Sequence, residues 1–324
     1  MPYDMYAGLP LYRMLLVERN LREHYLLLPS AHIIFDYMSS ECISRDLIQI
    51  YDLLESGKEV PAGKGRSYSE YTTQLSRGLQ GLEEAQLIDQ FMLKAFESNA
   101  NIVEEKLAHK NAGQYTKFSW SVAAESNDNK GSAEMLWQIA FDQAVQICCS
   151  YLNADQIPIW ITNFGRQYEQ SVYYDMVGEF IDQIPILAHQ SDTPEALAEA
   201  VQMRIDKAVR HNINFMSFMY DPEIASKYPE ASQLLRSSLE GTPIIFNYVG
   251  EGGAASMGSM IEQVEQMEGQ LEDRVIMFTA RFSDNQLYLS LVLPYEEHHD
   301  TMLNSIKLNN SIANHSIEYK EVLL

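Results

Sequence analysis

The sequence predicts an α/β fold in which mixed sheets are flanked by helices, and three observations lead to this class. Several long segments carry apolar residues at helical spacing. Short runs rich in β-branched and aromatic residues, typical of strands, lie between those segments. Strands and helices also alternate along the chain, as they do in α/β proteins. With 324 residues, the chain is long enough for two lobes.

The first predicted elements are a hairpin and a helix. Residues 11–17 and 24–28 are expected to pair as strands, with polar "ERNLRE" between them. Apolar side chains at helical spacing between residues 42 and 54 predict a helix that follows the hairpin. Ser39 or Ser40 is the expected N-cap of this helix, because a serine hydroxyl can accept a hydrogen bond from the first turn.

Two helices, split near Gly81, are predicted next, and residues 99–114 then become polar and lose their periodicity. We expect a boundary between lobes there. Thr193 and Pro194 predict an N-cap and a first helical position. The remaining predicted elements are the helices "GSAEMLWQIAFDQAVQICCSYL", "TPEALAEAVQMRIDKAVRHN" and "HDTMLNSIKLNNSIA", and the strands "IPIWITNF", "TPIIFNYVG", "RVIMFTARF" and "QLYLSLVL".

Composition excludes several classes of function. The formal net charge is -22 and no basic run is present, so a nucleic-acid partner is not expected. No apolar run approaches the length of a membrane span and no leader opens the chain, so we expect no membrane association and a cytoplasmic location. Cys42, Cys148 and Cys149 fit no metal spacing and are interpreted as core residues in a reducing compartment.

The stretch "LLLPSAHIIFDYMSSE" contains the main candidate for chemistry. His32 follows an apolar strand and precedes Asp36 by four residues, just before the predicted helix. This spacing alone is common by chance. A neutral imidazole can nevertheless accept a proton near pH 7, so His32 is a candidate general base.

This stretch resembles the His-His-x-x-x-Asp-Gly signature of nonribosomal peptide synthetase condensation domains. His32 and Asp36 match the second His and the Asp, whereas Ala31 and Tyr37 replace the first His and the Gly. Further blocks similar to those of the family follow in the same order along the chain. They are "SYSEYTTQL", "IPIWITNFGRQYEQSVYYDMVGEFIDQIPI", "AVRHNINFMSF" and "GTPIIFNYVG".

The resemblance implies a two-lobed chloramphenicol acetyltransferase-like fold. Residues 1–112 would form a partial N-terminal lobe with the His-x-x-x-Asp motif, and residues 113–324 the C-terminal lobe. The family's opening helix has no counterpart in this sequence. The resemblance therefore implies that the first part of the N-terminal lobe is missing. Three explanations are open: a split protein completed by another segment, a fragment of a longer chain, or a degenerate copy.

The resemblance also implies a function. A condensation-type acyltransferase joins a carrier-bound acyl or peptidyl thioester to a carrier-bound amino acid in nonribosomal peptide or hybrid polyketide biosynthesis. His32 would be base or positioner, and Asp36 would pair with Arg166 to support the site. Asp182 and Asn247 are expected to line the tunnel. No metal or cofactor is expected on this chain, because the 4'-phosphopantetheine belongs to upstream and downstream carrier proteins.

Two other interpretations remain open. The replaced positions Ala31 and Tyr37 favour a noncatalytic or degenerate module that docks carrier proteins. An epimerizing or ester-forming relative is the second alternative, although Gln167 stands where epimerization domains often carry Glu. Of the three, the acyltransferase is favoured.

Overall fold

The protein is described from a computed structural model, which covers residues 11–20, 24–63, 66–77, 82–107, 114–123, 133–168, 171–251, 275–283, 286–294 and 318–323. Contacts divide the chain into two compact units. Unit 1 comprises Met1–Ser76, Phe164–Ile181 and Ala255–Glu262, and unit 2 comprises Arg77–Asn163, Asp182–Ala254 and Gln263–Leu324. This division differs from the predicted lobe boundary at residue 112, which remains a prediction.

Unit 1 begins with the predicted hairpin, which is confirmed. Strand β1 (Leu15–Glu18) pairs antiparallel with β2 (His24–Leu27), and Leu16 lies opposite Leu26. Every residue of both strands is exposed. Successive side chains of a strand point to opposite faces, so this two-stranded ribbon is bare on both sides.

A short 3-10 turn (His32–Ile34) leads from the ribbon to helix α1 (Tyr37–Glu55), so the predicted helix is confirmed. Its predicted cap is wrong: Asp36 is the N-cap, and its Oδ1 accepts a hydrogen bond of 2.7 Å from the Ser39 backbone N–H. Asp36 has extended backbone, which lets its carboxylate reach back to the first turn. The apolar side chains of Tyr51 and Leu54, near the end of α1, are exposed.

Unit 1 is completed by helix α2 (Tyr68–Arg77), of which only Arg77 falls in unit 2, and by the short hairpin of β5 (Gln167–Tyr168) and β6 (Ser171–Val172). Its small apolar core contains Tyr71, Met176 and two further aromatic residues, Tyr173 and Phe180. The rings of Tyr71 and Phe180 lie 4.5 Å apart. These contacts pack the 164–181 segment against α2.

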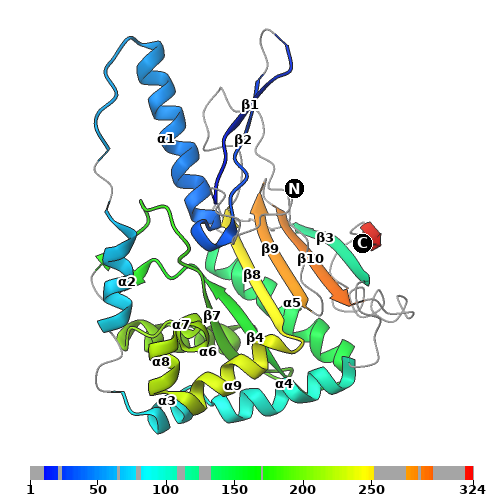
Figure 1. Ribbon diagram of the computed structural model, residues 1–324. Coiled ribbons are helices and arrows are strands. Elements are labelled where there is room, and N and C mark those ends of the chain that lie inside the picture. The colour runs from blue at the N-terminus through cyan, green and yellow to red at the C-terminus, as the bar shows by residue number, and fades with distance from the viewer. Residues whose placement is uncertain are drawn as a thin grey trace. The chain divides into compact units, whose positions relative to one another are not determined.

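Unit 2 contains a seven-stranded mixed sheet, in which the strands follow the order β11-β3-β10-β9-β8-β4-β7 (Figure 1). The pairs β4–β8 and β8–β9 are parallel and the other pairs are antiparallel. The strands are β3 (Gln114–Ala123), β4 (Gln156–Asn163), β7 (Asp182–His189), β8 (Ile244–Glu251), β9 (Ile276–Ser283), β10 (Gln286–Pro294) and β11 (Glu318–Leu323).

Helices cover both faces of this sheet. They are α3 (Glu84–Gln90), α4 (Leu93–Leu107), α5 (Ala133–Leu152), α6 (Pro194–Arg210), α7 (Phe215–Tyr220), α8 (Pro222–Lys227) and α9 (Pro229–Glu240). Phe96 of α4 packs on Trp160, whereas Phe141 of α5 packs on Phe246. Trp160 pairs with Ile245, the neighbour of Phe246, so the two contacts lie on opposite faces.

Several local predictions were wrong in unit 2. A break at Met92, whose φ is 49°, separates α3 from α4, so three helices rather than two follow the loop after α1. Helix α4 continues to Leu107, through residues predicted to be irregular. Strand β3 was not predicted, although buried Phe118 and Trp120 alternate with less buried neighbours. The predicted strands β4, β8, β9 and β10 are confirmed.

The cap of α6 and the burial of the cysteines were predicted, and they are confirmed. Helix α6 has Thr193 as its N-cap and Pro194 in its first turn, as expected. All three cysteines are buried and free. The predicted helix at 299–313 lies outside the described residues. Within those residues, no helix is both long and apolar enough to cross a membrane, and no cluster of His, Cys, Asp and Glu could hold a metal.

Candidate active site

The candidate active site lies within unit 1, where the ribbon leads into α1. Asp36 caps the helix, and its Oδ1 also accepts a hydrogen bond of 2.7 Å from the Ser39 hydroxyl. Four residues earlier, His32 opens the 3-10 turn. Because Asp36 is 1% exposed and bonded to the first helical turn, it fixes the backbone that presents His32.

A buried arginine completes this support. Nη2 of Arg166 lies 2.5 Å from Oδ1 of Asp36, and both side chains are fully buried. Nη1 of the same guanidinium donates to the backbone carbonyls of Tyr173 (2.9 Å) and Met176 (2.6 Å). The carbon between these nitrogens lies 4.2 Å from the centre of the Phe180 ring. The ion pair therefore joins the start of α1 to the 164–181 segment.

The path of that segment requires a glycine before Arg166. Gly165 has a φ of +55°, which L-residues with a side chain rarely adopt. A Cβ at this position would lie 2.1 Å from the carbonyl oxygen of Phe180. The close approach brings Phe180 to α1, where its backbone N–H donates to Oδ2 of Asp36 at 3.3 Å.

His32 itself is 75% exposed in its side chain and lies beside an acid from the same segment. Its Nδ1 is 2.6 Å from Oε2 of Glu179, which is 23% exposed. The hydrogen bond to Glu179 raises the pKa of His32, and partial burial opposes this effect. Among the described side chains, only Glu179 makes a hydrogen bond to the imidazole of His32.

The structure brings some predicted site residues together and leaves others in unit 2. His32, Asp36 and Arg166 lie in unit 1 with the two altered motif positions. The buried Ala31 donates its backbone N–H to Leu11, and Tyr37 is the first residue of α1. The φ of Tyr37 is not positive, so the backbone there does not require the glycine of the family signature.

The two expected tunnel residues belong to unit 2. Asp182 is buried, and its Oδ1 accepts backbone hydrogen bonds from Gln183 (2.9 Å) and Met216 (3.1 Å). Burial raises the pKa of Asp182 to about 6, against the lowering effect of these backbone bonds. The bond from Met216 anchors the start of α7 to Asp182 within unit 2. Asn247, the second expected tunnel residue, is half-buried in β8.

Two residues of the site, Glu179 and Ser39, were not predicted from the sequence. Glu179 lies between Gly178 and Phe180 in the stretch "IPIWITNFGRQYEQSVYYDMVGEFIDQIPI", where a glutamate by itself does not indicate a site residue. Ser39 was considered only as a cap, whereas its hydroxyl donates to Asp36 and lies near Arg166 and Gly178. Long-range contacts of this kind, across 127 to 147 positions, have no local pattern that would identify them.

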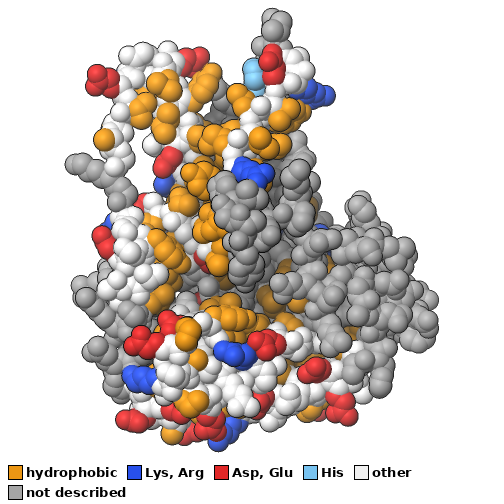
Figure 2. All heavy atoms as spheres, in the orientation of Figure 1, with side chains coloured by type: hydrophobic (Ala, Val, Ile, Leu, Met, Phe, Trp, Pro, Cys, Tyr) orange, Lys and Arg blue, Asp and Glu red, His pale blue; other side chains and the backbone are white. Residues whose placement is uncertain are grey.

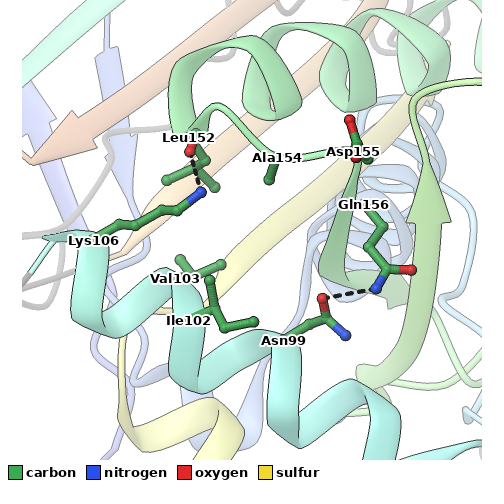
Figure 3. Close-up of a pocket in the computed structure, with 8 residues that line it drawn as sticks. All are labelled: Asn99, Ile102, Val103, Lys106, Leu152, Ala154, Asp155 and Gln156. Atoms are coloured by element: carbon green, nitrogen blue, oxygen red, sulfur yellow. Dashed lines mark hydrogen bonds between the residues drawn. The ribbon is translucent and has the colours of Figure 1, made fainter.

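A separate cleft of about 410 Å³ lies in unit 2, between α4 and the turn after α5 (Figure 3). Lys106 donates there to the carbonyls of Leu152 and Asn153 at the C-terminal end of α5. Gln156 donates to Asn99 across the cleft (3.1 Å). Asn99, Lys106 and Gln156 thus bond to the protein itself, and none of the candidate site residues lines the cleft.

Comparisons with known proteins identify relatives of this chain. The family model described as Condensation domain matches residues 1–227. Chondramide synthase cmdD of Chondromyces crocatus is 23% identical over 238 residues, which are 70% of this chain and 6% of that protein. A linear gramicidin synthase chain of Brevibacillus parabrevis is 22% identical over 243 residues, which are 72% of this chain and 5% of that protein.

Solved structures show the same fold. The epimerization domain from the third module of tyrocidine synthetase B has a TM-score of 0.55 and 16% identity, over 93% of this chain and 71% of that one. A structure on condensation domain-mediated chain release from the enacyloxin polyketide synthase has a TM-score of 0.58 and 12% identity. The match covers 93% of this chain and 60% of that one. The chain spans only 6% and 5% of the length of the two curated relatives named above.

Proposed function

Since the chain belongs to the condensation domain family of nonribosomal peptide synthetases, we propose that it is an amide-forming acyltransferase. Its fold is the chloramphenicol acetyltransferase-like α/β fold that the resemblance implied. Condensation domains of such synthetases work with thioesters on the phosphopantetheine of carrier proteins. The proposed reaction joins an acyl or peptidyl thioester on one carrier to the amine of an amino acid on another.

The observation that supports this proposal best is an exposed imidazole on a buried, charge-paired support. In the proposed reaction, the amine nitrogen attacks the thioester carbonyl carbon, so a C–N bond forms and the C–S bond breaks. His32 accepts the amine proton at Nε2 and returns it to the departing thiolate. Asp36 and Arg166 take no part in proton transfer, because they are buried and hold the backbone around His32.

The experiment compares His32→Ala with wild type, using one carrier loaded with a panel of acyl thioesters and a second loaded with a panel of aminoacyl groups. We expect amide formation to fall by about 100-fold or more, the usual contribution of a general base. His24→Ala, which removes an exposed histidine from β2, is the matched control and should retain activity. Equal rates for His32→Ala and wild type would contradict the proposal. Carrier binding without turnover by wild type would favour the noncatalytic docking module.

A further part of the proposal concerns partners. Besides the two carrier proteins, we infer a strand-forming segment that completes the predicted N-terminal lobe of residues 1–112. The bare β1–β2 ribbon supports this, because Leu15, Leu16, Leu26 and Leu27 expose apolar side chains on both faces. Figure 2 shows hydrophobic side chains exposed along the ribbon on the face in view. A lone two-stranded ribbon is marginally stable in water, so it favours additional pairing.

This partner can be tested by hydrogen exchange. A longer polypeptide that includes residues encoded upstream, or the product of a neighbouring reading frame, should protect the amides of β1 and β2. Equal exchange with and without that segment would contradict the inference. The cytoplasmic location remains a prediction that is consistent with the family.

A further inference from the structure

We propose that Glu179 is a positioning residue for His32: its carboxylate accepts a hydrogen bond from Nδ1–H of the imidazole and leaves Nε2 as the atom that receives the substrate proton. This inference rests on the proposed function, and it identifies the group that orients the base. A neutral imidazole carries one proton, and the partner of one ring nitrogen determines which nitrogen holds it.

The carboxylate of Glu179 is held at both oxygens. Oε2 lies 2.6 Å from Nδ1 of His32, and Oε1 accepts a hydrogen bond of 3.0 Å from the backbone N–H of Ile181. The Tyr68 hydroxyl donates to the backbone carbonyl of Glu179. Three contacts therefore fix this side chain and its backbone, although the imidazole is largely exposed.

The residues on either side of Glu179 are tied to the start of α1. The backbone N–H of Gly178 donates to the Ser39 hydroxyl at 3.0 Å, and that of Phe180 donates to Oδ2 of Asp36 at 3.3 Å. A Cβ on Gly178 would lie 2.5 Å from the Tyr68 ring, so the backbone passes close to α2 here. Asp36 also follows His32 by four residues. The buried hydrogen bonds of Asp36 and Ser39 therefore set the positions of both His32 and Glu179.

The charges around the imidazole favour its protonated form. Glu179 lies in direct contact, and Asp36 adds a weaker attraction for the imidazolium. Arg166 pairs with Asp36 and offsets part of that attraction. Tyr68 contributes no charge near neutral pH, because burial raises its pKa to about 12. The pKa of His32 is raised as a result, chiefly through the hydrogen bond to Glu179.

If Glu179 orients His32, the pH dependence of kcat/KM should change when Glu179 is replaced, which a purely structural role of Glu179 would not produce. A general base acts in its neutral form, so a raised pKa for His32 moves the acidic limb of kcat/KM to higher pH. Replacing the charged carboxylate in Glu179→Gln should return that limb to lower pH. The rate at high pH should fall about tenfold, because the base is less well oriented and less basic.

The experiment measures two quantities in the full chain. One is the pH profile of kcat/KM with the acyl-loaded and aminoacyl-loaded carriers, and the other is the NMR titration of His32, assigned by its loss in His32→Ala. Both midpoints should move to lower pH in Glu179→Gln. Asp175→Asn, which removes an exposed acid from the same segment, should leave both unchanged.

Each outcome is decisive. An unchanged His32 titration in Glu179→Gln would overturn the proposal. If Glu179→Gln does not fold, Glu179→Asp tests the same point, because its shorter side chain withdraws the carboxylate and should also lower the midpoint. A titration that moves while the kinetic profile does not would support the pair and contradict His32 as the base, which separates this inference from the proposed function.

Discussion

Two of the contacts between a basic and an acidic side chain within unit 1 differ in nearly everything except length. Nη2 of Arg166 and Oδ1 of Asp36 are 2.5 Å apart, and both side chains are 0% exposed. His32 and Glu179 are separated by 2.6 Å, with side chains 75% and 23% exposed. Both partners of the buried pair make further hydrogen bonds, whereas the imidazole of the exposed pair bonds to Glu179 alone among the described side chains.

The difference in burial indicates different roles for the two pairs: the buried pair holds the structure together, and the exposed pair contains a group that can titrate. A buried charge that loses its partner is left without solvation, so the Arg166–Asp36 pair behaves as a fixed structural joint. An exposed pair is screened by water and contributes little to stability. Its histidine can exchange its proton with solvent near neutral pH. The same short stretch of chain thus contains a residue that must stay fixed and a residue that can titrate.

The largest expected effect comes from breaking the buried pair. Arg166→Met should lower the free energy of unfolding by about 3–5 kcal/mol, because Asp36 would remain as an uncompensated buried charge. Denaturant titration measures this loss. Arg45→Met, which breaks the exposed contact of Arg45 with Asp46 (3.5 Å), should cost less than about 1 kcal/mol. Similar losses in both variants would remove the distinction between buried and exposed pairs.

An intermediate effect is expected at the turn that positions Arg166. Gly165→Ala should destabilise the protein by about 3 kcal/mol, since its Cβ would clash with Phe180 at a backbone conformation unfavourable for alanine. Gly57→Ala is the matched control, because Gly57 has a φ of +67° and nothing lies within 4 Å of its added Cβ. That variant should lose only about 1–2 kcal/mol. Equal losses in thermal or denaturant unfolding would show that backbone conformation, and not the clash, dominates.

The smallest effect should come from the exposed pair and should depend on pH. The pKa of His32 is raised in the folded state from 6.5, so its contribution to stability is fully present below that value. It is lost as the pH rises through the folded pKa. Glu179→Gln should therefore be less stable than wild type by about 0.2–1 kcal/mol at pH 5.5 and equal to it at pH 9. A difference that grows with pH would contradict the sign.

Much of the fold could be predicted from local patterns. Thr193 and Pro194 start a helix through contacts with their own first turn, and the strand pattern before His32 depends on a few neighbouring residues. The break at Met92 could not be predicted in this way, because nothing in its residue type requires a positive φ. Asp36 was assigned to the site but not to the helix cap, although one carboxylate serves both.

The class of fold and the order of most of its elements follow from the amino-acid sequence, because hydrophobic periodicity and motif order can be read along the chain. The pairing of Asp36 with Arg166 was implied by the resemblance to condensation domains. The contact of Glu179 with His32, across 147 positions, emerges only when the chain is folded. That contact depends on the close approach of Gly165 to Phe180 and on backbone bonds to Asp36. Such a path is set by packing in three dimensions, which no local pattern encodes.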